Sequence, residues 1–172
     1  MRFEHLPQLS PAAAASVKKI LHECQDEFVP PLSLRTATNS AQLVGGPGAT
    51  VGFEAYYASM AKQAFVLAYD EATDELLAFL TYIPKAKVSY FEGDCAYVST
   101  VCTTARARGK GIAAALYRQL EDILGAGDIC LKTWSTNIAQ IKILPRLGYQ
   151  EFKRVSNERG EGIDSVYFHK AL

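Results

Sequence analysis

The sequence lacks several features that mark particular classes of protein. No apolar run approaches the ~20 residues that a membrane-spanning helix needs, and the N-terminus has no apolar segment typical of a signal peptide. Lys and Arg together number 18, and Asp and Glu also number 18, so the basic excess of nucleic-acid-binding proteins is missing. We therefore expect a cytoplasmic protein with no membrane partner and no nucleic acid partner.

Cysteine and histidine are few and widely spaced. The four cysteines, Cys24, Cys95, Cys102 and Cys130, form no Cys-x-x-Cys pair, and the three histidines lie far apart in the chain. This spacing is typical neither of a disulfide framework nor of a zinc site. We expect buried thiols in a reducing compartment, and no metal site.

The composition that is present indicates one folded domain. The chain has 172 residues, of which 49% are hydrophobic and 21% charged, and this suits a single domain over residues 1–172. Apolar periodicity and turn residues predict the secondary structure. Helices are expected at about 11–29, 52–62, 109–124 and 138–147, and strands at about 1–7, 64–69, 76–83, 95–103, 129–134, 149–155 and 163–170.

The order of these elements predicts an α+β fold. We expect a mixed, mostly antiparallel sheet with helices on both faces and one parallel strand pair around the third helix. Residues 30–50 are expected to form a loop, and residues 84–87 a break between strands. Pro145 should distort the fourth helix between Ile141 and Leu147, because proline has no N–H to donate.

A turn at residues 108–113 joins the strand that ends at Thr103 to the third helix. Its glycines let the backbone approach a ligand, and the helix directs its free N–H groups and positive dipole end into the turn. This arrangement is typical of a phosphate site. A Walker A loop is excluded because Gly111 stands where Ser or Thr is required. A dinucleotide loop is weakened, with Ala114 in place of its third glycine, and an ordinary turn before a surface helix stays open.

The same turn resembles the pyrophosphate loop of the GNAT superfamily of N-acetyltransferases, whose pattern is Gln/Arg-x-x-Gly-x-Gly/Ala. Here the pattern reads Arg108-x-x-Gly111-x-Ala113. A second copy, Arg106-x-x-Gly109-x-Gly111, lies in another frame. We favour the later frame because its glycine opens the helix directly.

A second stretch carries the same resemblance. The family reads Asn-x-x-Ala-x-x-x-Tyr-x-x-x-Gly-Phe, and this sequence has Asn137, Gln140, Leu144, Gly148 and Tyr149 at those positions. The asparagine, glycine and final aromatic match, whereas the alanine and tyrosine do not. With the order of elements, the resemblance covers nearly the whole chain. It implies a GNAT-like fold, acetyl-CoA as co-substrate, and transfer of an acetyl group to a primary amine of a small molecule or peptide.

The resemblance also implies which residues hold acetyl-CoA. The strand backbone at residues 101–103 would pair with the pantetheine arm as an added strand would. The amides of residues 109–114 would hold the pyrophosphate through charge-assisted hydrogen bonds. The full implied set is Val101, Cys102, Thr103, Arg108, Gly109, Lys110, Gly111, Ile112, Ala113, Ala114 and Asn137.

The catalytic residues are less well specified. Acetyl transfer to an amine requires a neutral amine and a proton or positive field for the leaving thiolate. Relatives often place a Glu early on the strand before the loop, near Tyr97 here, but no carboxylate lies between Tyr97 and Thr103. Glu92 and Asp94 just upstream are therefore candidate bases, directly or through water. Leu144 replaces the tyrosine that is the general acid of many relatives. The acid is then expected to be Tyr97, Tyr149, Tyr167 or water.

Two other functions stay open. The missing tyrosine allows a CoA-binding sensor or an inactive scaffold that kept the cofactor groove, and the glycine turn alone allows a nucleotide-binding protein. Binding of acetyl-CoA, but not of ATP or NAD, would exclude the nucleotide-binding protein. We expect a monomer or homodimer, with the amine acceptor between the 30–50 loop, the second helix and the last hairpin.

Overall fold

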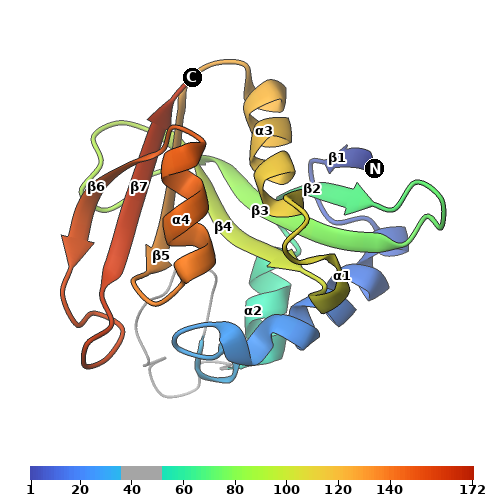
Figure 1. The fold of residues 1–172 in the computed structure, drawn as a ribbon, viewed down its shortest axis with the longest axis horizontal. Helices are drawn as coiled ribbons and strands as arrows, with labels where there is room; N and C mark the ends of the chain where they lie inside the picture. The colour runs from blue at the N-terminus through green and yellow to red at the C-terminus, as the bar shows by residue number, and fades with distance from the viewer. Residues whose placement is uncertain (36–51) are drawn as a thin grey trace.

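The computed structural model describes residues 1–35 and 52–172, which form a seven-stranded mixed sheet with helices on both faces (Figure 1). This is the predicted α+β fold. Most of the predicted 30–50 loop lies outside the described residues. The helices are α1 (Pro11–Cys24), α2 (Phe53–Met60), α3 (Ile112–Leu124) and α4 (Ile138–Arg146), and the strands are β1 (Arg2–Leu6), β2 (Ala64–Tyr69), β3 (Leu76–Ala86), β4 (Cys95–Thr103), β5 (Asp128–Trp134), β6 (Gln150–Val155) and β7 (Ser165–Ala171).

The strands are ordered β1-β2-β3-β4-β5-β7-β6 in the sheet. All neighbours are antiparallel except β4 and β5, which are parallel and are connected through α3. A parallel pair needs such a crossover because a tight turn reverses the chain. The crossover brings the end of β4 and the start of α3 close to the C-terminal half of β5.

Two apolar cores lie on opposite faces of the sheet. Successive side chains of a strand point to opposite faces, and on β2 the core with α3 takes Val66 and Ala68, whereas the core with α1 and α2 takes Phe65 and Leu67. All four side chains are at most 1% exposed. The sheet is therefore covered on both sides around β2, β3 and β4, which holds β4 rigidly.

Helix α1 begins as predicted and ends earlier. Ser10 Oγ accepts a hydrogen bond from the Ala13 N–H at 3.3 Å, with Pro11 as the first helical residue. The helix ends at Cys24, not near residue 29, and one turn of 3-10 helix, Gln25–Glu27, follows it. This tighter turn moves the chain toward the end of β4.

The predicted break at residues 84–87 is wrong. Strand β3 continues through Pro84 to Ala86, and its register with β4 shifts between Ile83 and Ala86. Proline cannot donate to the strand ladder, so it is tolerated in a strand where pairing is irregular. The strand therefore continues through Pro84 with a local shift in its pairing, where the proline had suggested that it would end.

Helix α4 also continues through its proline. It runs to Arg146, and the Leu147 N–H donates to both Ile143 O at 3.2 Å and Leu144 O at 3.0 Å, so the last turn is irregular within the stretch that we expected Pro145 to distort. The helix lacks one backbone hydrogen bond there, because proline has no N–H to donate to Ile141 O. Gly148, with φ of 89°, then turns the chain into β6.

All four cysteines are buried free thiols, as predicted. Within residues 1–35 and 52–172, no group of three or more His, Cys, Asp or Glu side chains is placed to hold a metal ion. None of the described helices combines the length and the apolar character that crossing a membrane requires.

Candidate active site

Strands β4 and β5 separate partway along their length. They pair only over Ala96–Val98 and Ile129–Leu131. Beyond this point β4 remains bonded to β3 as far as Thr103, and β5 remains bonded to β7. The other edge of β4, from Ser99 to Thr103, therefore has no strand partner among the described residues. An open edge presents N–H and C=O groups to an extended ligand.

A bulge in β4 marks the start of this separation. Thr81 on β3 pairs with Thr100, and Tyr82 pairs with Val98, so Ser99 has no partner in the register. An extra residue of this kind bends its strand and increases the local twist. The Ser99 and Thr81 hydroxyls are hydrogen-bonded at 2.8 Å, which fixes the bend where β4 leaves β5.

The glycine turn lies at the end of the open edge. Gly109 and Gly111 have φ of 73° and 76°, a region that other residues adopt only with strain. The first hydrogen bond of α3 runs from the Ala115 N–H to Gly111 O at 3.1 Å. The amides ahead of it, from Ile112 to Ala114, have no acceptor within the part of the chain that the structure describes. Free amides at a helix N-terminus, with the helix dipole, form an anion site.

The basic side chains around the turn differ in their environments. Arg108 is paired with Glu27, with Nη2 and Oε1 2.7 Å apart, and this hydrogen bond raises the pKa of Arg108. Arg106 is paired with Glu75. Lys110 is exposed and makes no hydrogen bond or ion pair with any described residue. Lys110 is thus free to meet an anion, whereas Arg108 is held beside the open edge.

A cavity of about 570 Å³ occupies the gap between β4 and β5, a volume typical of ligand pockets. Its wall includes Tyr117 and Leu131, which belong to the core with α3, and Phe28 and Cys102, which belong to the core with α1. The cavity is therefore lined from both faces of the sheet. Among the implied cofactor residues, Val101, Cys102, Thr103, Arg108, Gly109, Gly111, Ile112, Ala113 and Asn137 line the cavity, whereas Lys110 and Ala114 do not.

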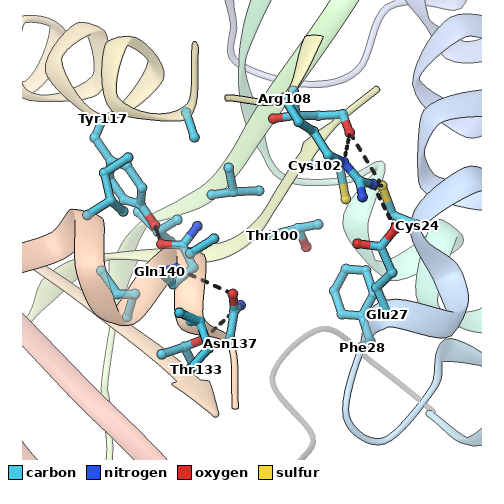
Figure 2. Close-up of a pocket in the computed structure, with 18 of the residues that line it drawn as sticks. Cys24, Glu27, Phe28, Thr100, Cys102, Arg108, Tyr117, Thr133, Asn137 and Gln140 are labelled. Carbon is cyan, nitrogen blue, oxygen red and sulfur yellow. Dashed lines mark hydrogen bonds and ion pairs between the residues drawn. The ribbon is translucent and has the colours of Figure 1, made fainter. Parts of the chain in front are cut away.

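Asn137 connects two walls of the cavity (Figure 2). Its Oδ1 accepts the Gln140 N–H at 3.3 Å, which caps α4, and its Nδ2 donates to Thr133 Oγ1 at 3.1 Å. Asn137 therefore caps α4 and also connects it to β5 beside the gap.

Tyr117 is a cavity residue that the sequence analysis does not identify. The side chain is 1% exposed, and its hydroxyl donates to Gln140 Oε1 at 3.0 Å. Burial raises the pKa of Tyr117, so the hydroxyl stays protonated at neutral pH. Figure 2 shows this pair on the opposite side of the cavity from Cys24 and Glu27. In the sequence Tyr117 belongs to the apolar stripe of α3, which gives no signal beyond a core position.

The residues expected to catalyse the reaction do not line the cavity. Asp94 precedes β4, and hydrogen bonds from Lys87 and Lys85 lower its pKa. Glu92 is exposed in the same turn. Tyr97 lies at the paired end of β4, on the face away from α3, and burial raises its pKa to about 12.

The other expected proton donors, Tyr149 and Tyr167, also lie away from the cavity, as does the position of the missing family tyrosine. Leu144, which replaces that tyrosine, is 0% exposed in the core with α3. Tyr149 is buried in the same core, and its hydroxyl has no hydrogen-bond partner among the described residues. Tyr167 is buried on the opposite face of β7, where burial raises its pKa to about 12. Among the described tyrosines, only Tyr117 lines the cavity.

The mixed sheet, the parted parallel strands and the anion-binding turn define the acetyltransferase class that the sequence resembles. The sequence matches the Acetyltransferase (GNAT) family over residues 21–149. The chain therefore belongs to the GNAT acetyltransferase family, whose co-substrate is acetyl-CoA.

Solved structures of low sequence identity share the fold. An aminoglycoside 6'-N-acetyltransferase complexed with coenzyme A is 15% identical, with a TM-score of 0.66 over 99% of this chain and 97% of that chain. The ribosomal-protein-alanine N-acetyltransferase from Brucella melitensis is 14% identical, with a TM-score of 0.69 over 100% of both chains. Arabidopsis thaliana NAA60 in complex with acetyl-CoA is 15% identical, with a TM-score of 0.67 over 99% of this chain and 100% of that chain. A comparison with curated protein sequences finds no match.

Proposed function

We propose that residues 1–172 form one acetyltransferase domain that transfers an acetyl group from acetyl-CoA to a primary amine of a small molecule or peptide. The observation that carries this proposal is the open edge of β4, from Ser99 to Thr103, which leads directly to the free amides of the glycine turn. An extended arm and a diphosphate are the two parts of coenzyme A that such a surface fits.

The residues present fit this co-substrate. The backbone of Val101 and Thr103 would pair with the pantetheine arm, and the amides of residues 109–114 would hold the pyrophosphate. Lys110, which has no partner among the described residues, would approach the phosphates from solvent. Asn137 would contact the arm from the α4 side while it keeps its cap.

The reaction needs little chemistry from the protein itself. When bound, acetyl-CoA supplies a thioester: a C–N bond forms to the amine, the C–S bond breaks, and the proton that the amine loses balances the thiolate. Tyr117 is proposed as the proton donor, because it is the one described tyrosine that lines the cavity. Glu92 and Asp94 remain a hypothesis for the base, directly or through water, and Tyr97 remains a hypothesis for the acid.

The two kinds of acceptor are both compatible with the fold. Proteins of similar structure include an aminoglycoside 6'-N-acetyltransferase and a ribosomal-protein-alanine N-acetyltransferase. At about 15% identity these likenesses extend to the fold alone, so both acceptor classes belong in any screen.

One observation favours a second candidate, a CoA-binding sensor or inactive scaffold. Glu27 is the sole carboxylate among the described residues that line the cavity, and it is paired with Arg108. A site without a free carboxylate has no evident base, although a water molecule can take that role.

Mass spectrometry of amine panels incubated with acetyl-CoA separates the two candidates. Acetylated product that requires the enzyme supports the transferase. Binding of acetyl-CoA, seen by calorimetry, without product from any small amine or peptide N-terminus supports the scaffold. Equal binding of ATP and acetyl-CoA would contradict both.

A further inference from the structure

Two arginines from distant parts of the chain, Arg35 buried and Arg159 partly buried, meet at one backbone carbonyl. Arg35 is 4% exposed, and it donates from Nη2 to Val29 O at 2.9 Å and from Nε to Pro30 O at 3.0 Å. Arg159, in the connection between β6 and β7, donates from Nη1 to the same Val29 O and from Nε to Ser165 Oγ at 2.9 Å. Among the described residues, neither arginine donates a hydrogen bond to a carboxylate. A guanidinium has five N–H donors, more than these bonds use.

The charges around this meeting point do not balance. Lys132 on β5, with a side chain 12% exposed, adds a third cation, and we call Arg35, Arg159 and Lys132 the cationic cluster. Glu158 is the one acid paired with it, through Lys132 Nζ at 3.7 Å. Within the described residues no ion pair joins either arginine to a carboxylate, and residues 36–51 contain no Asp or Glu.

Burial makes this excess of positive charge costly. Desolvation, and then the charge of Arg35, lower the pKa of Arg159 to about 10. Desolvation also lowers the pKa of Lys132, and the two arginines lower it further. Buried charges are normally paired, so a cluster with a surplus of cations is arranged to receive an anion from outside the chain.

The cluster adjoins the cavity at the wall formed by Phe28, Lys132 and Trp134. Lys132 lines the cavity itself. Behind the wall, the Arg35 guanidinium lies 5.4 Å from the centroid of the Phe28 ring, and the Arg159 guanidinium lies 5.5 Å from that of Trp134. In Figure 2, Phe28 lies at the opposite end of the drawn wall from Arg108, whose turn is the anion site for the cofactor.

From this juxtaposition we infer that the amine acceptor carries an anionic group, such as a carboxylate, which is bound by Lys132 and stabilised by the field of Arg35 and Arg159. The inference rests on the proposed acetyltransferase function and narrows its acceptor class. A polycationic acceptor is excluded, because a second ammonium group would meet three cations. The acceptor is instead an amino acid, or a peptide with an acidic side chain near its N-terminus.

Matched acceptors test the charge preference. One set is β-alanine, β-alaninamide and 1,3-diaminopropane, and the other is the amidated dipeptides Ala-Glu, Ala-Gln and Ala-Lys. Product is quantified by mass spectrometry at saturating acetyl-CoA. In at least one set, kcat/KM for the carboxylate should exceed that for the carboxamide by about 30-fold, the size of one charge-assisted hydrogen bond, and the diamine or lysine member should be slowest. Equal rates, or a preference for the cationic member, would overturn the inference.

Variants locate the preference in the cluster. Lys132→Gln should reduce the carboxylate-to-carboxamide ratio to about one, whereas Lys132→Arg should retain most of it. Arg159→Gln removes a positive charge near the acceptor but no hydrogen bond to the acceptor, so it should reduce the ratio by about fivefold. Lys142→Gln removes the same charge from an exposed position of α4 and should leave the ratio unchanged. A ratio that survives Lys132→Gln in a protein with normal thermal unfolding contradicts the assignment.

Two further arms separate this inference from the proposed function. If no amine is acetylated, thermal shifts in the presence of CoA compare N-acetyl-β-alanine with N-acetyl-β-alaninamide. A thermal shift that occurs with the acid alone and depends on Lys132 would support the anion site although the proposed transferase activity fails. The absence of any shift would overturn both the anion site and the proposed function. If succinyl-CoA outperforms acetyl-CoA with neutral amines, and Lys132→Gln removes that advantage, then the anion belongs to the acyl group and the acceptor assignment is wrong.

Discussion

The two ends of the cavity are built in different ways. At the cofactor end, the groups that meet a ligand are mainly backbone amides and carbonyls of one continuous stretch, from β4 through the glycine turn into α3. At the other end they are side chains: Lys132, Phe28 and Trp134 line the cavity, and Arg35 and Arg159 lie behind that wall. A backbone site recognises a group common to the whole family. A site made of side chains can change its charge without changing the fold, and we propose that this end selects the acceptor.

The largest expected effect tests the cofactor end. Gly109→Asp places a carboxylate among the free amides, so acetyl-CoA affinity should fall about 100-fold or more, the equivalent of one or two charge-assisted hydrogen bonds. Isothermal titration calorimetry measures the change.

Gly125→Asp is the matched control for that variant. Gly125 has a similar φ, 67° against 73°, and an added side chain meets nothing within 4 Å at either position, but Gly125 lies at the other end of α3. It should keep acetyl-CoA affinity within about threefold while losing a comparable amount of stability, about 1–2 kcal/mol. Equal loss of affinity in both variants would show that backbone strain, not anion binding, explains the result.

The next effect tests the wall between the two ends. Tyr117→Phe removes the hydroxyl that lines the cavity, and kcat should fall about 30-fold, with little change in KM for acetyl-CoA. Steady-state kinetics from pH 6 to 10 measure it. Tyr149→Phe is the control: its hydroxyl has no partner among the described residues, and it should leave kcat unchanged and stability unchanged or slightly higher. If the two variants behave alike, Tyr117 is not the proton donor.

A smaller effect concerns the position where the family tyrosine is missing. Leu144 is 0% exposed, so Leu144→Tyr should overpack the core and reduce the free energy of unfolding by about 1–3 kcal/mol, without raising kcat. Leu144→Met, which nearly conserves volume, should cost less than about 1.5 kcal/mol. Urea denaturation gives both values. A gain in kcat with Leu144→Tyr would mean that α4 presents this position to the cavity.

The smallest effect is expected away from both ends, at Asp94. Hydrogen bonds from Lys87 and Lys85 lower its pKa in the folded protein. Its contribution to stability is therefore present above the ordinary carboxyl pKa of about 4 and is lost as the pH falls through the lower folded value. Asp94→Asn should lose a small amount of stability at pH 7 and none near pH 2, as thermal unfolding can show. Activity tests the hypothesis that Asp94 is the base: a loss of about 100-fold would support it, and a change of less than about twofold would contradict it.

Local sequence signals predict the cofactor end well. Ser10 and Asn137 are residue types that favour helix caps, and both cap their helices. Gly111 lies at the start of α3 as expected, because glycine adopts that backbone without strain. Where prediction failed, the neighbouring structure had overridden a local rule. Pro84 stays within a strand because the pairing with β4 shifts there.

The sequence by itself determined the order of the elements, the single parallel strand pair and the glycine turn before α3, because each depends on residues close together in the chain. Only the tertiary structure decided that β4 parts from β5 after Val98, that Tyr117 faces the cavity while Leu144 does not, and that Arg35 and Arg159 meet at Val29. Those arrangements join residues far apart in the chain. Their charge and burial exist only once the sheet and both of its cores have formed.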